Sequence, residues 1–271
     1  MIESYIVDWI QLIFRWLHLI TGIAWIGASF YFVWLDNSLE NPPQWKQDKG
    51  IKGDLWAIHG GGIYEVAKYS LAPEQMPTHL HWFKWEAYTT WLTGMVLLIV
   101  IYYFGADAYL IDKRVADLSQ WQAIGIGVAY LSAGWIFYEL LCRSPLGKNA
   151  YVIGTILILA AVAIAYSLTH LFSGRGAYIH MGAIIGTIMV GNVFRVIMPS
   201  QRALVAAIEK GKAPDPAWGQ RAKLHSTHNT YLTLPLLFIM ISNHYPMTYA
   251  SANNWLILLV IMAITAVARQ Y

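Results

Sequence analysis

The sequence predicts an all-α protein, a polytopic transmembrane helical bundle of about seven spans in a single membrane domain, residues 1–271. Of its 271 residues 57% are hydrophobic and only 12% are charged, and there are 13 Trp and 17 Tyr, residues that concentrate at membrane interfaces. Several apolar runs reach the roughly 20 residues that a helix needs to cross a bilayer. This composition excludes a soluble globular protein, and the formal charge of +3 indicates no nucleic-acid partner.

The single cysteine, Cys142, limits the chemistry that the chain can carry. It excludes an internal disulfide framework, an iron–sulfur cluster and a haem attached covalently through Cys-x-x-Cys-His. Any haem in this chain must therefore be held by non-covalent ligands.

Hydropathy predicts the spans in this order: 12–35, 82–104, 121–142, 150–171, 177–199, 226–243 and 253–271. The first is a retained span and not a cleaved signal peptide, because Glu3 and Asp8 precede it without a basic cluster. Apart from the first connection, residues 36–80, the connections are taken as short, and neighbouring spans are therefore expected to be antiparallel.

The lysines and arginines of the connections predict the orientation. Three lie on the side of the second and fourth connections: Lys113, Arg114 and Arg175. Eleven lie on the opposite side: Lys46, Lys49, Lys52, Lys68, Arg143, Lys148, Arg202, Lys210, Lys212, Arg221 and Lys223. The positive-inside rule therefore places the N-terminus outside and residues 36–80 in the cytoplasm.

Residues 36–80 are too long for an ordinary connection and too aromatic for a disordered one. Two β-prone stretches flank Gly60, Gly61 and Gly62, a pattern typical of a hairpin or a compact lid. His59 beside these glycines offers an imidazole and unobstructed backbone N–H groups to a small anionic ligand. The alternative is a lid that only covers helix ends.

Ionisable residues interrupt the first span near its start. At helical spacing Arg15, His18, Gly22 and Trp25 share one stripe, which suits a flat ligand. An ionisable group inside a span is costly unless it has a partner. The alternative is that His18 bonds to a carbonyl or hydroxyl of a neighbouring helix, while Arg15 extends to the lipid headgroups.

The predicted orientation sorts the nine histidines by depth. His18, His170, His180 and His244 lie towards the outer side. A six-coordinate haem b needs two axial ligands from different helices at similar depth, with cations near its propionates. His18 and His180 meet this condition, with Arg15 and Arg175 at the same level. They are the leading pair of iron ligands, with His170 or His244 as substitutes. The alternative is interfacial histidines bonded to headgroups and water.

A second histidine cluster lies towards the inner side. The residues concerned are His79, His81, Lys84 and Glu86 at the start of the second span and His225, His228 and Asn229 at the start of the sixth. Zinc is disfavoured because no third ligand is specified. The cluster predicts either an anion pocket with a proton acceptor or a second haem between His81 and His228. Arg195, inside the fifth span, needs Glu86, Glu139 or a bound anion as its partner.

Four segments carry a family resemblance: RWLHLITGIAWIGASFYFVWLD, WAIHGGGIYEVAKY, APEQMPTHLHWFKWEAY and GNVFRVIMPSQ. Together they resemble the membrane domain of the bacterial membrane-bound urate hydroxylases, the urate oxidase N-terminal family, over nearly the whole chain. In that family another span and a C-terminal c-type cytochrome follow. No Cys-x-x-Cys-His occurs here, so that cytochrome domain is absent from this chain, and we expect the polypeptide to continue past Tyr271.

The resemblance implies oxidation of urate to 5-hydroxyisourate in the bacterial inner membrane, with a periplasmic N-terminus and with electrons passed to a c-type cytochrome. A flat urate monoanion needs a cation, in-plane donors, an apolar cover and a base. The inner cluster offers all four. Arg195 or Lys84 would hold the anion, and Gly60 to Gly62 and Asn229 would offer donors. Trp82 or Trp85 would cover a face, and His81, His228 or Glu86 would take the proton. His59 and His225 are further substrate-binding candidates. One haem b, or two, would carry the electrons outward.

Two other functions remain open from the sequence. A b-type haem subunit that oxidises quinol would show haem spectra but no reduction by urate. A purine transporter is disfavoured, because no span is broken by paired Gly and Pro at mid-depth and no internal repeat is evident.

Overall fold

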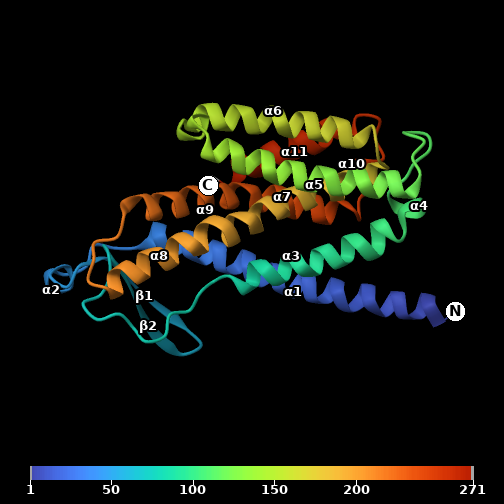
Figure 1. The fold of residues 1–271 in the computed structure, drawn as a ribbon. Helices are drawn as coiled ribbons and strands as arrows, with labels where there is room; N and C mark the ends of the chain where they lie inside the picture. The colour runs from blue at the N-terminus through green and yellow to red at the C-terminus, as the bar shows by residue number, and fades with distance from the viewer. Residues whose placement is uncertain (1, 270–271) are drawn as a thin grey trace.

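The computed structural model describes residues 2–269 and is an all-α bundle, which confirms the predicted fold class (Figure 1). Its helices are α1 (Ile2–Ser38), α2 (Gln44–Gln47), α3 (Trp85–Leu97), η1 (Leu98–Tyr103), α4 (Ala106–Tyr109), α5 (Gln120–Arg143), η2 (Pro145–Lys148), α6 (Ala150–Thr169), α7 (Gly174–Asn192), η3 (Val193–Ile197), α8 (Met198–Glu209), α9 (Pro216–Ser242), α10 (Pro246–Tyr249) and α11 (Asn254–Ala268). The two strands are β1 (Ile51–His59) and β2 (Gly62–Tyr69).

Helices occupy all seven predicted spans, and five segments within residues 2–269 are long and apolar enough to cross a membrane. These five are Tyr5–Ser38, Trp85–Tyr103, Gln120–Arg143, Ala150–Thr169 and Gly174–Glu209. The sixth predicted span lies in α9, which begins earlier with a polar stretch, and the seventh lies in α11, an apolar helix of 15 residues. The last two residues of the predicted seventh span, 270–271, lie outside the described residues.

Side chains at the helix starts explain where several of these helices begin. Ser119 and Gln122 form a capping box at the start of α5. Asn149, Ser173 and Asp215 each accept a backbone N–H bond at the starts of α6, α7 and α9. These N-terminal caps therefore set the residues at which α5, α6, α7 and α9 begin.

The bundle has two ends that differ in content (Figure 1). The β-hairpin, η2 and the turn from α8 to α9 lie at one end, which we call the hairpin end. The N-terminus, α4 and α10 lie at the other, which we call the α4 end. The first, third and fifth connections, which together carry eleven lysines and arginines, therefore all lie at the hairpin end, as the sequence predicts.

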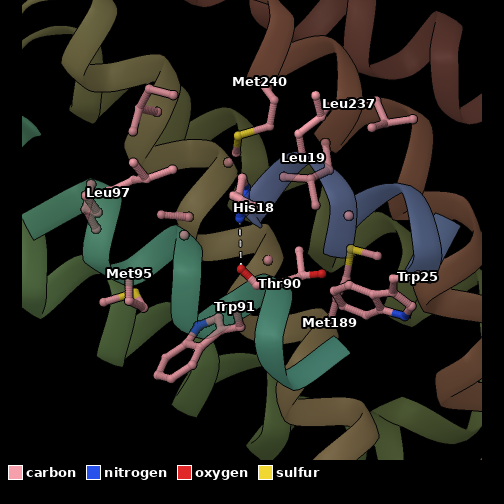
Figure 2. Close-up of a pocket in the computed structure, with 18 of the residues that line it drawn as sticks. His18, Leu19, Trp25, Thr90, Trp91, Met95, Leu97, Met189, Leu237 and Met240 are labelled. Carbon is pink, nitrogen blue, oxygen red and sulfur yellow. Dashed lines mark hydrogen bonds between the residues drawn. The ribbon is translucent and has the colours of Figure 1, made fainter. Parts of the chain in front are cut away.

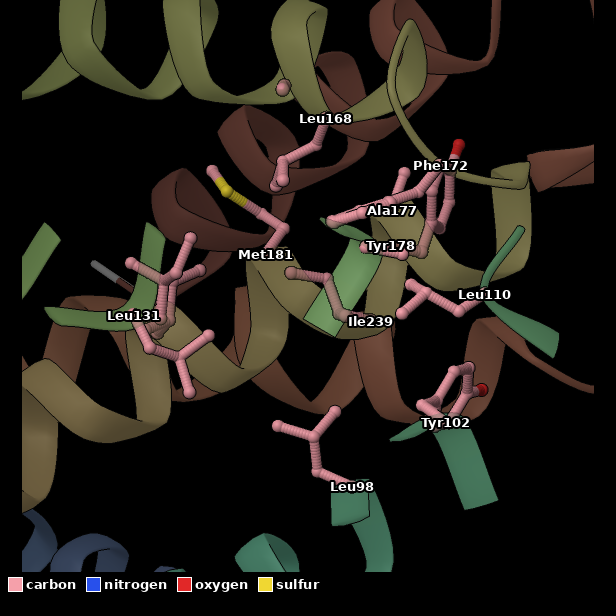
Figure 3. Packing of buried hydrophobic residues seen from close by; sticks show 14 of the residues in the cluster. Leu98, Tyr102, Leu110, Leu131, Leu168, Phe172, Ala177, Tyr178, Met181 and Ile239 are labelled. Atoms are coloured by element: carbon pink, nitrogen blue, oxygen red, sulfur yellow. The ribbon is translucent and has the colours of Figure 1, made fainter. Parts of the chain in front are cut away.

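The core surrounds α7, which packs against α3, α5, α6 and α9. Its Tyr178 is fully buried and contributes to one large apolar cluster with Leu110, Phe172 and Ile239 (Figure 3). By contrast, α1 packs chiefly along α3. This arrangement leaves space between α1 and α3 on one side and α7 and α9 on the other.

The predicted hairpin between the first two spans is present. Strands β1 and β2 are antiparallel with His59 opposite Gly62, so that Gly60 and Gly61 form a two-residue turn. Their φ angles of +57° and +82° suit the tight turns that need glycine. Lys46 is buried at the base of the hairpin between Asp54 and Glu65. Hydrogen bonds to these two carboxylates, first Asp54, raise the pKa of Lys46 above its usual value.

Candidate functional site

A cavity of about 450 Å³ lies between α1, α3, α7 and α9. It extends from Arg15 and Arg175 near the α4 end to Ser29 and Asn229 towards the hairpin end, and most of its wall is apolar. Its volume falls within the range of small-molecule and cofactor sites. Figure 2 shows how side chains from these helices meet in it.

The α4 end of the cavity is polar and positively charged. Arg175 Nε and the Tyr102 hydroxyl both donate to Asn243 Oδ1, at 3.0 and 3.1 Å. Arg15 and His244 line the cavity beside them. Among the side chains described, those of residues 5–269, no carboxylate forms an ion pair with Arg15 or Arg175. This end therefore suits an anion.

His18 lines the cavity with its ring held in one orientation (Figure 2). Its Nδ1 lies 2.9 Å from the Thr90 carbonyl and 3.1 Å from Thr93 Oγ1. Since a carbonyl only accepts, Nδ1 carries the proton and Nε2 keeps its lone pair. The ring also fits closely over Gly94, where a Cβ would lie 2.9 Å from His18 Cε1. The result is an imidazole with an available acceptor nitrogen at the cavity wall.

The middle of the cavity is walled by aromatic and thioether side chains. Trp25 and Trp91 lie on the α1–α3 side, and Trp91 Nε1 donates to Thr187 Oγ1 of α7 at 3.1 Å. Met189 and Met240 lie on the α7–α9 side. All four residues of the stripe predicted in the first span, Arg15, His18, Gly22 and Trp25, line this space.

His180 lies apart from the cavity. It is fully buried, its Nδ1 donates to the Gly176 carbonyl at 2.8 Å, and its ring packs 4.8 Å from that of Phe172. Its Nε2 has no partner but points at α5, where a Cβ on Gly127 would lie 2.6 Å away. The structure therefore does not bring His180 to His18. Of the suggested substitutes, His244 lines the cavity, whereas His170 bonds to Tyr166 on the exposed side of α6.

Part of the predicted inner cluster forms a buried polar network between α5, α7 and α9. Asn192 Nδ2 donates to Asn229 Oδ1 at 2.8 Å and to the Tyr138 hydroxyl at 3.0 Å. That hydroxyl lies 2.7 Å from His228 Nδ1, and the His225 ring is next to His228 at 6.0 Å. Since Asn229 also lines the cavity, the network leads from the cavity towards the hairpin end.

The remaining inner residues lie elsewhere. His81 and Glu86 are 3.6 Å apart near the start of α3, beside Phe83, and Lys84 lies over the Trp85 ring. Trp82 packs on a small apolar cluster formed by Ala87, Val190, Val193 and Met198. His59 and Gly60 to Gly62 form the exposed hairpin tip, and His79 is also exposed. These residues do not share one pocket with His225, His228 and Asn229.

Arg195 lies exposed on η3 and has no ion pair with either carboxylate suggested for it. Glu86 lies beside His81, and Glu139 is paired with Arg143 at 2.5 Å. Over residues 5–269, whose side chains the structure describes, no group of three His, Cys, Asp or Glu residues has the geometry for a metal ion.

Sequence reasoning missed several residues that complete these sites: Thr90, Thr93, Tyr102, Tyr138, Asn243 and Met240. Each lies in or beside an apolar run, and the tyrosines, threonines and methionine among them do not stand out there because these residue types are common in such runs. Their roles depend on which neighbouring helix they face, and periodicity within one helix does not specify this.

One family model, described as urate oxidase N-terminal, matches residues 4–271. No curated protein and no solved structure matches the chain.

Proposed function

Because the chain belongs to the urate oxidase N-terminal family, we propose that it is the membrane part of an enzyme that oxidises urate to 5-hydroxyisourate. In this proposal urate gives up two electrons, and a haem b held by this chain would supply the one-electron transfers to a c-type cytochrome. Water supplies the added oxygen, and two protons are released. The observation that carries the proposal is the cavity between α1, α3, α7 and α9, which His18, Arg15 and Arg175 line and in which neither arginine has an ion pair with a described carboxylate.

The residues of the cavity fit haem b. Arg15 and Arg175 at the α4 end match the two propionates, and the apolar wall matches the porphyrin. His18 offers Nε2 as an iron ligand, and its Nδ1–H bond to Thr90 is the kind of contact that orients metal-bound histidines. When bound, haem supplies one-electron transfer. The fit favours His18 over His180, since His180 faces a closed core.

The polar network beside the cavity supports a role for His228 as the proton acceptor. The Tyr138 hydroxyl accepts from Asn192, so its own hydrogen is left for His228 Nδ1. Nε2 of the neutral His228 ring then carries the hydrogen and Nδ1 the lone pair, so His228 would take up a proton at Nδ1 through the Tyr138 hydroxyl. His81 with Glu86 is the other candidate, but this pair is not continuous with the cavity. Urate would then bind at the Asn229 end.

A redox spectrum of the purified protein, recorded anaerobically with and without urate, tests the proposal. We expect a Soret band and its shift to the reduced form when urate is added. Haem without reduction by urate would favour a quinol-linked electron-transfer subunit instead. A colourless protein that moves urate across vesicles would favour a transporter.

Matched variants test the assignment of the cavity. His18→Ala should lose the Soret band, whereas His180→Gln should keep it, because only His18 faces the cavity. Loss of haem in His180→Gln with a retained fold and normal haem in His18→Ala would overturn this assignment.

A further inference from the structure

Two cavity residues on opposite walls lie at the same depth from the polar α4 end. His18 follows Arg15 by three residues on α1, and Met240 precedes Asn243 by three residues on α9. At 1.5 Å per residue, each lies about 4.5 Å further into the bundle than its polar neighbour. Arg15 and Asn243 both line the polar α4 end of the cavity, where Asn243 accepts from Tyr102.

The two side chains also face the same space. Both line the cavity, His18 from the α1–α3 wall and Met240 from the α7–α9 wall. Figure 2 shows the bond from one His18 nitrogen to Thr90, and in this view Met240 lies on the side of His18 away from Thr90. Met240 is held by Gly182, where a Cβ would lie 2.6 Å from the methionine methyl. Imidazole nitrogen and thioether sulfur are thus directed at one region.

Other residues are less suited to be the partner of His18. His244 lies at the polar mouth, beyond the level of Asn243, and His180 faces α5. Met95 lines the cavity from α3, the same wall as His18, and Met189 lies nearly three turns from Ile179, towards the hairpin end. Two axial ligands must lie on opposite faces of one ring at one depth.

We propose that His18 Nε2 and Met240 Sδ are the two axial ligands of the haem iron. This inference rests on the proposed function, since it concerns the same haem. A thioether stabilises ferrous over ferric iron relative to a second imidazole, and so raises the reduction potential. A haem with this ligand pair is better suited to accept electrons from urate.

Spectroscopy of the purified protein tests the ligand pair without measuring turnover. We expect the oxidised protein to be low-spin and to show the sulfur-to-iron charge-transfer band in the near infrared. Met240→Leu should lose this band and become high-spin while haem stays bound through His18. Met240→His should remain low-spin, lose the band and have a lower midpoint potential.

Met189→Leu is the matched control, because it removes a thioether from the same cavity and should change neither the spin state nor the band. In Met240→Ala, added imidazole should restore a low-spin spectrum if the axial position is open. An unchanged spectrum in Met240→Leu, or loss of the low-spin form in His244→Ala alone, would overturn this ligand assignment while leaving the haem intact. A protein without haem would instead overturn the proposed function.

Discussion

The histidines of the bundle differ in how their rings are fixed. His170, His180 and His225 each bond through Nδ1 to the carbonyl four residues earlier on the same helix. His18 instead bonds to Thr90, 72 residues away on α3. An intrahelical bond only satisfies the ring, whereas the bond of His18 sets its position relative to a second helix. This difference is why His18 is the better candidate for holding a ligand between helices.

Gly94 is predicted to be essential for the position of His18. In Gly94→Ala the new methyl would lie 2.9 Å from His18 Cε1, so the ring or α1 must move. Overpacking of this kind costs about 1 to 3 kcal/mol. We expect lower thermal stability and weaker haem retention, measured by unfolding in detergent and by the ratio of Soret to protein absorbance.

Gly125→Ala on α5 is the control for Gly94→Ala, since nothing lies within 4 Å of its Cβ position. It should retain haem as the unmodified protein does. Equal haem loss in both variants would mean that the position of His18 does not depend on Gly94.

Tyr138 is predicted to stabilise the buried network at the hairpin end. Tyr138→Phe keeps the ring but removes the hydroxyl that joins Asn192 to His228. A buried polar group left without a partner costs about 1 to 3 kcal/mol. We expect a lower unfolding temperature, a normal Soret band and slower reduction of the haem by urate, measured by stopped-flow.

Tyr130→Phe is the matched control for Tyr138→Phe, because it removes a half-buried hydroxyl bonded only to Ser167. A normal rate of haem reduction in Tyr138→Phe would contradict a role for the network in proton transfer.

At the scale of single elements, the spans and the hairpin could be predicted because their signals are local. An apolar run of sufficient length predicts a helix, and Gly60 with Gly61 between β-prone stretches predicts a two-residue turn. The π-helical turns at η1 and η3 were not foreseen. They interrupt α-helical hydrogen bonding within continuous apolar segments, and no residue type there marks the change.

The site was only partly predictable because it depends on how the helices are rotated about their axes. The stripe of Arg15, His18, Gly22 and Trp25 was correctly grouped, since these residues share one face of one helix. Pairing His18 with His180 required knowing which way α7 faces, and its His180 face is turned to α5. The inner cluster is divided for the same reason: α3 packs on α1, while α9 packs on α7 and α11.

The hairpin turn is predicted to need glycine at position 61 for backbone reasons alone. Gly61 has φ +82° and nothing lies within 4 Å of its Cβ position, so a side chain meets no neighbour. Gly61→Ala should destabilise the hairpin by about 1 kcal/mol, and Gly61→Asn by less, because asparagine adopts positive φ more readily. Hydrogen exchange over Ile51–Tyr69 should therefore rise most in Gly61→Ala and less in Gly61→Asn. Equal exchange in Ala and Asn variants would contradict it.

At the scale of the whole molecule, the two ends of the cavity differ in charge. The cavity has its arginines at the α4 end and its amide network towards the hairpin end. In the proposed function, a haem in this cavity would lie between the proton acceptor His228, towards the hairpin end, and the c-type cytochrome that accepts electrons at the α4 end. The proposed function therefore requires that the two ends face different compartments.

The positive-inside rule predicts which compartment each end faces, and Cys142 makes the test simple because it is the only cysteine. In a Cys142→Ser background, Ile58→Cys places a thiol on the hairpin, where Ile58 is 77% exposed, and Val115→Cys places one near α4, where Val115 is 41% exposed. A membrane-impermeant maleimide should label Val115→Cys in intact bacterial cells and Ile58→Cys only after permeabilisation. The reverse pattern would put the hairpin outside and, with it, the polar network that the positive-inside rule places towards the cytoplasm. The α4 end would then face the cytoplasm, and an external c-type cytochrome would be at the wrong end of the cavity to receive electrons.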